Sequence, residues 1–309
     1  PDFDTPAAIM QAGIDALRDG ATHYTSNAGL IELREAIAEA LNARYGVAYN
    51  PADEILVTVG VSEALYLAMA ALLDPGDEII IPEPCFVSYA PTARIVGARP
   101  VMVPTSVEND FQVTAAAIEA AITARTKVVF IASPNNPTGT VIHHERLEEI
   151  ATVVAAHNLV VISDEIYDRL VYGVEHTCFA SLVDPATSSR MRQRTIVLQG
   201  FSKTYAMTGW RIGYLAGPAD LVAGMFRLHQ YLIMSAPTPA QWAALKALQA
   251  GEPYVQAMWL EYDRRRQLVV QALNDMGLNC VEPQGAFYAF PCVNRTGMDD
   301  ETFAQRLLE

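Results

Sequence analysis

Short runs of β-branched and other apolar residues alternate with longer amphipathic segments along most of the chain. This alternation is typical of an α/β protein, because parallel strands that are buried on both faces need helical crossovers between them. The apolar runs predict strands over residues 55–59, 78–81, 101–103, 128–132, 160–163, 196–199 and 212–216. We therefore expect a large domain with three layers, α/β/α, built around a mostly parallel seven-stranded sheet.

Two of the helices carry clear end signals. Thr5 is expected to cap the first helix, with Pro6 at its first position and Gly20 after its last turn. A second helix is expected over residues 30–45, where Gly46 ends it.

The pattern of the sequence changes after Pro253. A charged amphipathic segment predicts a long helix over residues 254–276, GAFYAF at 285–290 indicates a strand, and a final helical pattern follows. We interpret residues 21–252 as the large, cofactor-binding domain and residues 253–309 as a smaller α+β domain, here incomplete. The N-terminal segment, residues 1–20, is expected to belong with the small domain.

Composition and charge exclude several classes of protein. A chain of 309 residues with 51% hydrophobic and 18% charged residues is globular, and a formal charge of −14 disfavours nucleic acid or an anionic membrane as partner. No apolar run reaches the roughly 18 residues that a membrane-spanning helix needs. The four cysteines, at 85, 178, 280 and 292, have neither metal-site nor disulfide-framework spacing, so we expect no metal and a reducing, cytoplasmic location.

Parallel α/β sheets bind ligands at the carboxyl ends of their strands, so the residues that follow each strand in the sequence are the candidates for a site. Residues 60–62 open a helix whose free N–H groups can hold a phosphate, and residues 133–139 form a rigid loop that displays asparagine amides. Asp164 and Tyr167 place a carboxylate and a phenol behind the strand at 160–163. Each of these features, taken alone, fits an ordinary turn or cap at least as well.

Lysine is rare in this chain, with only Lys127, Lys203 and Lys246. Lys203 lies in QGFSKTYAMTGWR among small and apolar residues, and Arg211 follows it eight positions later. A solvated surface amine is the alternative for Lys203, and it fits these surroundings poorly. Arg211 is either a surface charge or an anion clamp.

One cofactor accounts for all these features together. Pyridoxal phosphate requires a lysine that forms a Schiff base, an acid that keeps its pyridine nitrogen protonated, donors for its phenolate oxygen and an anion site for its phosphate. The chain supplies these groups as Lys203, Asp164, the pair Asn136 and Tyr167, and the helix start at Val61 and Ser62 with Arg211.

The segment GFSKTYAMTGWRIG at 200–213 resembles the lysine signature of class I aminotransferases in the pyridoxal-phosphate fold type I superfamily. The motifs PDFDTP, NNPTG and SDEIY are similar to that family's and occur in its order, so the resemblance runs the length of the chain. It points to the branch that contains aspartate and aromatic amino-acid aminotransferases. It implies transfer of an amino group from an amino acid to a 2-oxo acid by a ping-pong mechanism.

The resemblance also implies a role for each matching residue. Lys203 would be the Schiff-base lysine and the group that moves the proton between substrate and cofactor, and Asp164 would pair with the pyridine nitrogen. Tyr24 would reach the phosphate of a neighbouring subunit, which implies a homodimer with shared sites. The remaining contacts would be Asn136 and Tyr167 to the phenolate oxygen, Asn136 also to substrate, Phe86 stacked on the ring, and Val61, Ser62, Ser202 and Arg211 around the phosphate, with Gly200 where many relatives carry serine.

Substrate binding is expected to involve residues outside this sequence. The resemblance implies that the arginine for the substrate carboxylate lies beyond Glu309 and that a glycine-bearing lid precedes Pro1. We therefore expect the chain to bind its cofactor but to turn over substrate less efficiently than an extended chain. Equal activity of both would indicate that an arginine such as Arg295 holds the carboxylate instead.

Two alternatives to an aminotransferase stay open at this point. A β-lyase or a decarboxylating synthase on the same scaffold would share the cofactor residues, and product analysis with one amino acid and no oxo acid separates them. A ligand-sensing domain of a transcription regulator would need an attached DNA-binding module, which the acidic composition disfavours.

Overall fold

The computed structural model describes residues 2–184, 187–188 and 190–309, and its centre is one seven-stranded sheet. The strand order is β1-β7-β6-β5-β4-β2-β3, and β7 runs antiparallel to β1 and β6 while the remaining pairs are parallel. The mostly parallel sheet expected from the sequence is thus confirmed. The strands are β1 (Ile55–Thr58), β2 (Glu78–Glu83), β3 (Arg99–Pro104), β4 (Thr126–Ala132), β5 (Val160–Asp164), β6 (Thr195–Gly200) and β7 (Gly213–Ala216).

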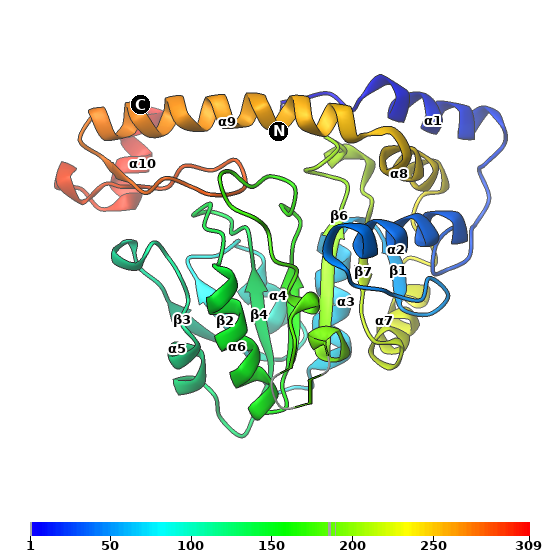
Figure 1. Cartoon of the computed structure of the whole chain (residues 1–309), viewed down its shortest axis with the longest axis horizontal. Coiled ribbons are helices and arrows are strands. Elements are labelled where there is room, and N and C mark those ends of the chain that lie inside the picture. Colours follow the sequence, from blue (N-terminus) through cyan, green and yellow to red (C-terminus); the bar gives the residue numbers. More distant parts are fainter. Residues whose placement is uncertain (1, 185–186, 189) are drawn as a thin grey trace.

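Helices cover both faces of the sheet, which gives the three layers seen in Figure 1. In β2, Ile79 and Ile81 pack on one helical layer and Ile80 on the other, as the two-residue period of a strand requires. The first layer consists of α3 (Gly60–Leu72), α4 (Tyr89–Ile95) and α7 (Ala219–Leu232). The second consists of α5 (Ala115–Ala120) and α6 (His144–Ala156) at one end, and α2 (Ile31–Tyr45) and α8 (Thr238–Ala250) at the other.

The long helix α9 (Glu252–Asp275) crosses one edge of the sheet in Figure 1. It contacts the loop behind β5, where Trp259 Nε1 donates to the carbonyl of Val171 at 2.7 Å. Arg169 from the same loop pairs with Glu252 through both terminal guanidinium nitrogens. Beyond α9, β8 (Asn279–Cys280) pairs with β9 (Pro291–Cys292), and α10 (Asp300–Leu308) follows. Among the described helices, none combines the length and apolarity needed to cross a membrane.

The start of the chain differs from the sequence-based expectation. Thr5 does not cap α1 (Ala7–Arg18), because Pro6 occupies the N-cap position and no side chain caps this end. The Thr5 hydroxyl instead donates to the carbonyl of Ala206 at 2.6 Å and accepts from Trp210 Nε1 at 3.0 Å. Thr5 therefore ties the N-terminal segment to the loop behind β6.

Residues 285–290 also differ from expectation, because they do not form a strand. Ala286 has a φ of 58°, which breaks an extended conformation, and Gly285 makes only an isolated bridge to Val171. Similarly, β7 begins at Gly213 and not at residue 212, because Arg211 has a φ of 51°. Both turns bring side chains toward the cavity described next.

Candidate active site

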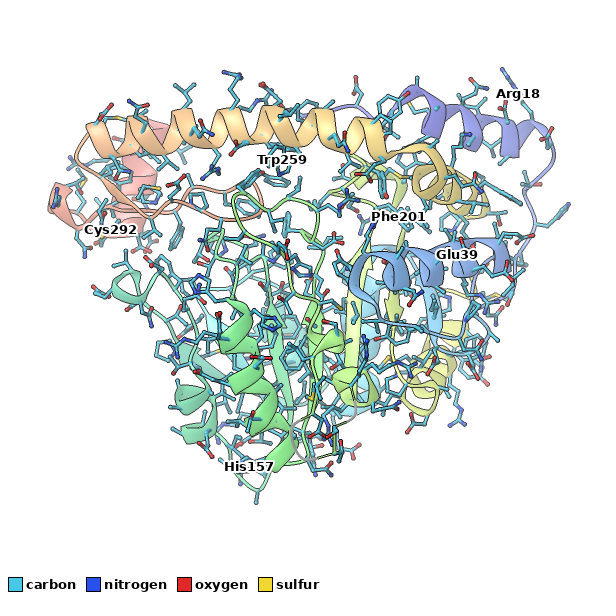
Figure 2. The ribbon with its side chains drawn as sticks, in the orientation of Figure 1. Arg18, Glu39, His157, Phe201, Trp259 and Cys292 are labelled. Atoms are coloured by element: carbon cyan, nitrogen blue, oxygen red, sulfur yellow. The ribbon has the colours of Figure 1, made fainter. Side chains whose placement is uncertain are left out.

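A cavity of about 330 Å³ lies at the carboxyl ends of the parallel strands. In Figure 2, Phe201, which follows β6 in the sequence, lies at the edge of the sheet that faces α9. His157, which follows α6 in the sequence, lies at the opposite edge. This is the edge at which α/β sheets bind ligands. Most of the residues predicted from the sequence line the cavity, namely Val61, Ser62, Phe86, Asn136, Asp164, Tyr167, Ser202, Lys203 and Arg211.

Asp164 ends β5 as a buried carboxylate that lines this cavity. Its Oδ2 accepts from the hydroxyl of Tyr89 at 2.9 Å, and its Oδ1 accepts from the backbone N–H of Ile166 at 3.2 Å. Burial nevertheless raises the pKa of Asp164 to about 6, because these two hydrogen bonds do not replace its lost hydration. A cationic group of a ligand placed beside this carboxyl would therefore be strongly favoured.

Lys203 lies in the turn behind β6, and its Nζ is 5.9 Å from the ring centroid of Tyr167 and 5.5 Å from that of Phe287. Burial, followed by the positive charge of Arg211, lowers the pKa of Lys203, and Asp164 opposes this change. A lowered pKa increases the fraction of neutral amine, which is the nucleophilic form of lysine. The other two lysines lie on β4 and α8, and neither lines the cavity.

One corner of the cavity is suited to an anion. The first N–H groups of α3, at Val61 and Ser62, have no partner within the helix, and Arg211 lies beside them. This approach depends on glycine, because a Cβ on Gly60 would lie 2.7 Å from an Arg211 guanidinium nitrogen. We call Gly60, Val61, Ser62 and Arg211 the anion corner.

The phenol of Tyr167 and the amide of Asn136 also line the cavity. The Tyr167 hydroxyl lies 2.6 Å from the hydroxyl of Tyr288, and either oxygen can donate. The side chain of Asn135 is used within its own loop, since its Oδ1 accepts from the N–H and the hydroxyl of Thr138 at 3.3 and 3.1 Å. Of the two neighbouring asparagines, Asn136 lines the cavity and Asn135 does not.

Two of the predicted site residues do not line the cavity. Gly200 is the last residue of β6 and does not contribute to the cavity wall. A Cβ on this residue would lie 3.1 Å from the Cα of Gly213 and 3.2 Å from Cγ2 of Val61. Tyr24 lies on the outer surface with 77% of its area exposed.

Two tyrosines of the cavity were missed by sequence reasoning. Tyr89 follows β2 by a few residues, so its place behind a strand was the signal that could have identified it. Tyr288 reaches the cavity through the turn at Ala286, which no local pattern of residues indicates.

Comparison with known proteins agrees with this chemistry. The family model described as aminotransferase class I and II matches residues 1–309. The putative aminotransferase YugH of Bacillus subtilis (strain 168) is 47% identical over 308 residues, covering 100% of this chain and 78% of the relative. The aspartate aminotransferase of Pyrococcus abyssi (strain GE5 / Orsay) is 44% identical over 311 residues, covering 100% of this chain and 78% of the relative.

A solved structure gives the same result. The aromatic aminotransferase from Pyrococcus horikoshii OT3 superposes with a TM-score of 0.96 at 44% sequence identity, covering 100% of this chain and 82% of the other. The chain therefore belongs to the class I and II aminotransferases, enzymes that use pyridoxal 5'-phosphate to move an amino group from an amino acid to a 2-oxo acid.

Proposed function

We propose that Lys203, Asp164 and Tyr167 carry out the amino-group transfer in this cavity. The observation that supports this most strongly is that an amine with a lowered pKa and a buried carboxylate line one cavity. The substrates we propose are aspartate or an aromatic amino acid and a 2-oxo acid such as 2-oxoglutarate. The names of an aspartate and an aromatic aminotransferase among the relatives support that choice.

The residues of the cavity fit pyridoxal phosphate in charge and in hydrogen bonding. Asp164 is buried and its pKa is raised, and a protonated pyridine nitrogen would place a positive charge beside its carboxylate. The anion corner suits a phosphate, because it combines helix N–H groups with a guanidinium. Asn136 and Tyr167 offer an amide and a hydroxyl for the phenolate oxygen, and Phe86 and Ser202 complete the surrounding wall.

When bound, the cofactor supplies a carbonyl carbon that takes up the amino group and a pyridinium ring that accepts the electrons of the broken C–H bond. Lys203 Nζ would take the proton from the α-carbon of the substrate and deliver it to the cofactor carbon that bears the amino group, and the second half of the exchange would run this transfer in reverse with the 2-oxo acid. Its lowered pKa suits both steps, because it can be neutral before the transfer and protonated after it. Asp164 would keep the proton on the pyridine nitrogen through its negative charge, and Tyr167 would donate a hydrogen bond to the phenolate oxygen.

Covalent labelling tests the assignment of Lys203. Borohydride reduction of the protein loaded with pyridoxal phosphate is expected to attach the label to Lys203 alone, and Lys203→Ala is expected to lose the label and nearly all turnover. Lys127→Ala and Lys246→Ala serve as controls, since neither side chain lines the cavity. A label on Lys127 or Lys246 in peptide mapping would overturn the assignment.

We further propose that the protein works as a homodimer in which Tyr24 contributes to the partner's phosphate site. The segment around Tyr24 lies beside the link between α7 and α8, because Thr238 Oγ1 donates to the carbonyl of His23 at 2.8 Å. The end of α7 and this link expose four successive apolar side chains, which we call the α7 patch. These are Tyr231, Leu232, Ile233 and Met234. An exposed apolar group of this kind supports a protein partner, and a second copy is the one we propose.

We also propose that residues 253–309 form a small domain with the N-terminal segment attached to it, next to a large domain over residues 21–252. Asp2 pairs with Arg265 of α9 at 2.6 Å, and the ring of Phe3 lies 5.1 Å from that of Tyr262, which supports the attachment. In Figure 1, α1 lies beside α8, so the same segment also contacts the large domain. A reducing, cytoplasmic location remains our proposal, supported by four cysteines that are all free thiols.

A further inference from the structure

Next to the anion corner lies a pair of side chains, Glu63 and His229, that the chemistry proposed above does not use; the side chain of Glu63 is 9% exposed and that of His229 is fully buried. Glu63 follows Ser62 directly in the first turn of α3, and its Oε2 accepts from the backbone N–H of Val59 at 2.5 Å. Its Oε1 lies 2.6 Å from Nδ1 of His229 on α7. The imidazole is fully buried, and its Nε2 has no hydrogen-bond partner within the described part of the chain.

The hydrogen bond from Val59 to Glu63 spans the backbone of the anion corner, residues 60–62. Val59 is the N-cap residue of α3, and Gly60, the first residue of the helix, turns the chain with a φ of 73°. The Glu63 side chain accepts from the N–H of Val59, so residues 60–62 are held between these two residues. The arrangement is similar to a capping box. The direction of the N–H groups at Val61 and Ser62 thus depends on the position of the Glu63 carboxylate.

His229 in turn fixes that carboxylate. Because Nε2 is buried without a partner, a proton on Nδ1 leaves only a lone pair of the ring unsatisfied, and Nδ1 then donates to Glu63. The contact joins α7 to α3, so the position of the turn depends on a residue far away in the sequence. The negative charge of Glu63 by itself opposes the binding of an anion at the anion corner. A positioning role explains why a carboxylate is present there.

We infer that Glu63 and His229 are positioning residues of the phosphate site: the chain of hydrogen bonds from His229 through Glu63 to Val59 orients the first N–H groups of α3 toward the phosphate of the cofactor. This inference rests on the proposed function, because it takes the phosphate to be the anion held at the anion corner. It assigns neither residue a contact with the cofactor.

Comparing two ligands separates positioning from general stability. Pyridoxal phosphate and pyridoxal differ only in the phosphate, so the ratio of their dissociation constants for the cofactor-free protein measures the phosphate contacts alone. We expect Glu63→Gln and His229→Leu to weaken pyridoxal phosphate about tenfold and to leave pyridoxal unchanged, since each leaves one buried hydrogen bond unmade. Competition by inorganic phosphate should weaken in parallel.

Glu63→Gln also distinguishes the two effects of the carboxylate. If its charge mainly repels the phosphate, the neutral glutamine will bind pyridoxal phosphate more tightly. If the carboxylate positions the turn, binding weakens, because a glutamine has only one oxygen for the two donors of Val59 and His229. Tighter binding would overturn the inference.

The chain offers a matched control in a second buried pair, Glu165 and His176, whose Oε2 and Nε2 lie 2.9 Å apart. Glu165 accepts there from Ser163 and Phe179, which are not part of the anion corner. His176→Leu is expected to lower the melting temperature while the ratio of the two dissociation constants stays constant. An unchanged ratio in both Glu63→Gln and His229→Leu would overturn the positioning role.

Failure of the proposed function has a different result. If the wild-type protein bound pyridoxal as tightly as pyridoxal phosphate, the anion corner would not be a phosphate site at all, and the inference would fall with it. If the wild type prefers pyridoxal phosphate and borohydride labels Lys203, but the variants keep the preference, only the positioning role is wrong.

Discussion

At Asp164, burial and ionisation oppose each other. The pKa of this carboxyl rises from 3.8 to about 6 because burial removes its hydration. Between these values the folded protein holds a proton that the unfolded chain has lost, so the free energy of unfolding falls as the pH rises through this range. The difference corresponds to about 3 kcal/mol. Urea unfolding of the cofactor-free protein should show that the free energy of unfolding of the wild type falls between about pH 4 and pH 8 relative to that of Asp164→Asn, because the asparagine side chain does not ionise.

The cofactor supplies the control for this measurement. With pyridoxal phosphate bound, the positive pyridine nitrogen favours the ionised form of Asp164, and the loss relative to Asp164→Asn should disappear. Parallel pH curves for the wild type and the variant without cofactor would contradict the assignment of a raised pKa.

At the scale of elements, the anion corner depends on how closely β7 approaches the start of α3. A Cβ on Gly213 would lie 2.9 Å from the carbonyl carbon of Gly60 and 2.9 Å from the nitrogen of Val61, both of which are backbone atoms. Gly213→Ala must therefore displace the turn, at a cost of about 1–3 kcal/mol. We expect a lower melting temperature and a selective loss of affinity for pyridoxal phosphate over pyridoxal, measured by titration of the cofactor-free protein.

Gly209 provides the matched control, because it is exposed, has no positive φ and has open space around its Cα. Gly209→Ala should leave both the melting temperature and the two affinities unchanged. If Gly213→Ala behaved in the same way, close packing of β7 would not determine the geometry of the anion corner.

At the scale of the whole molecule, the proposed homodimer determines whether the α7 patch is covered. Tyr231 is 85% exposed in the single chain, and Leu232 is 53% exposed. The double variant Tyr231→Glu, Leu232→Glu would place two charges in an apolar interface, where burial of an unpaired charge is costly. We therefore expect sedimentation velocity to show a dimer for the wild type and a monomer for this variant.

Leu260 on α9 is the control for this experiment, since it is exposed but lies outside the α7 patch. Leu260→Glu should remain dimeric. A wild type that sediments as a monomer, or a double variant that remains a dimer, would contradict the proposed interface.

The sequence by itself determined the seven strands and the residues directly behind them. Buried parallel strands must be apolar along their whole length, and their carboxyl ends must meet at one edge, so both features can be predicted locally. Lys203, Asp164 and Asn136 were predicted in this way and line one cavity. The roles of these residues toward the cofactor remain predictions.

Only the tertiary structure decided which distant residues complete the site. Tyr89 reaches Asp164 across 75 residues, Tyr288 reaches Tyr167 across 121, and His229 reaches Glu63 across 166. The positive φ at Arg211 makes β7 begin one residue later than expected, and the positive φ at Ala286 replaces the strand expected over residues 285–290 with a turn. Such contacts and turns depend on how complete elements pack, and a period of two or 3.6 residues in the sequence carries no information about them.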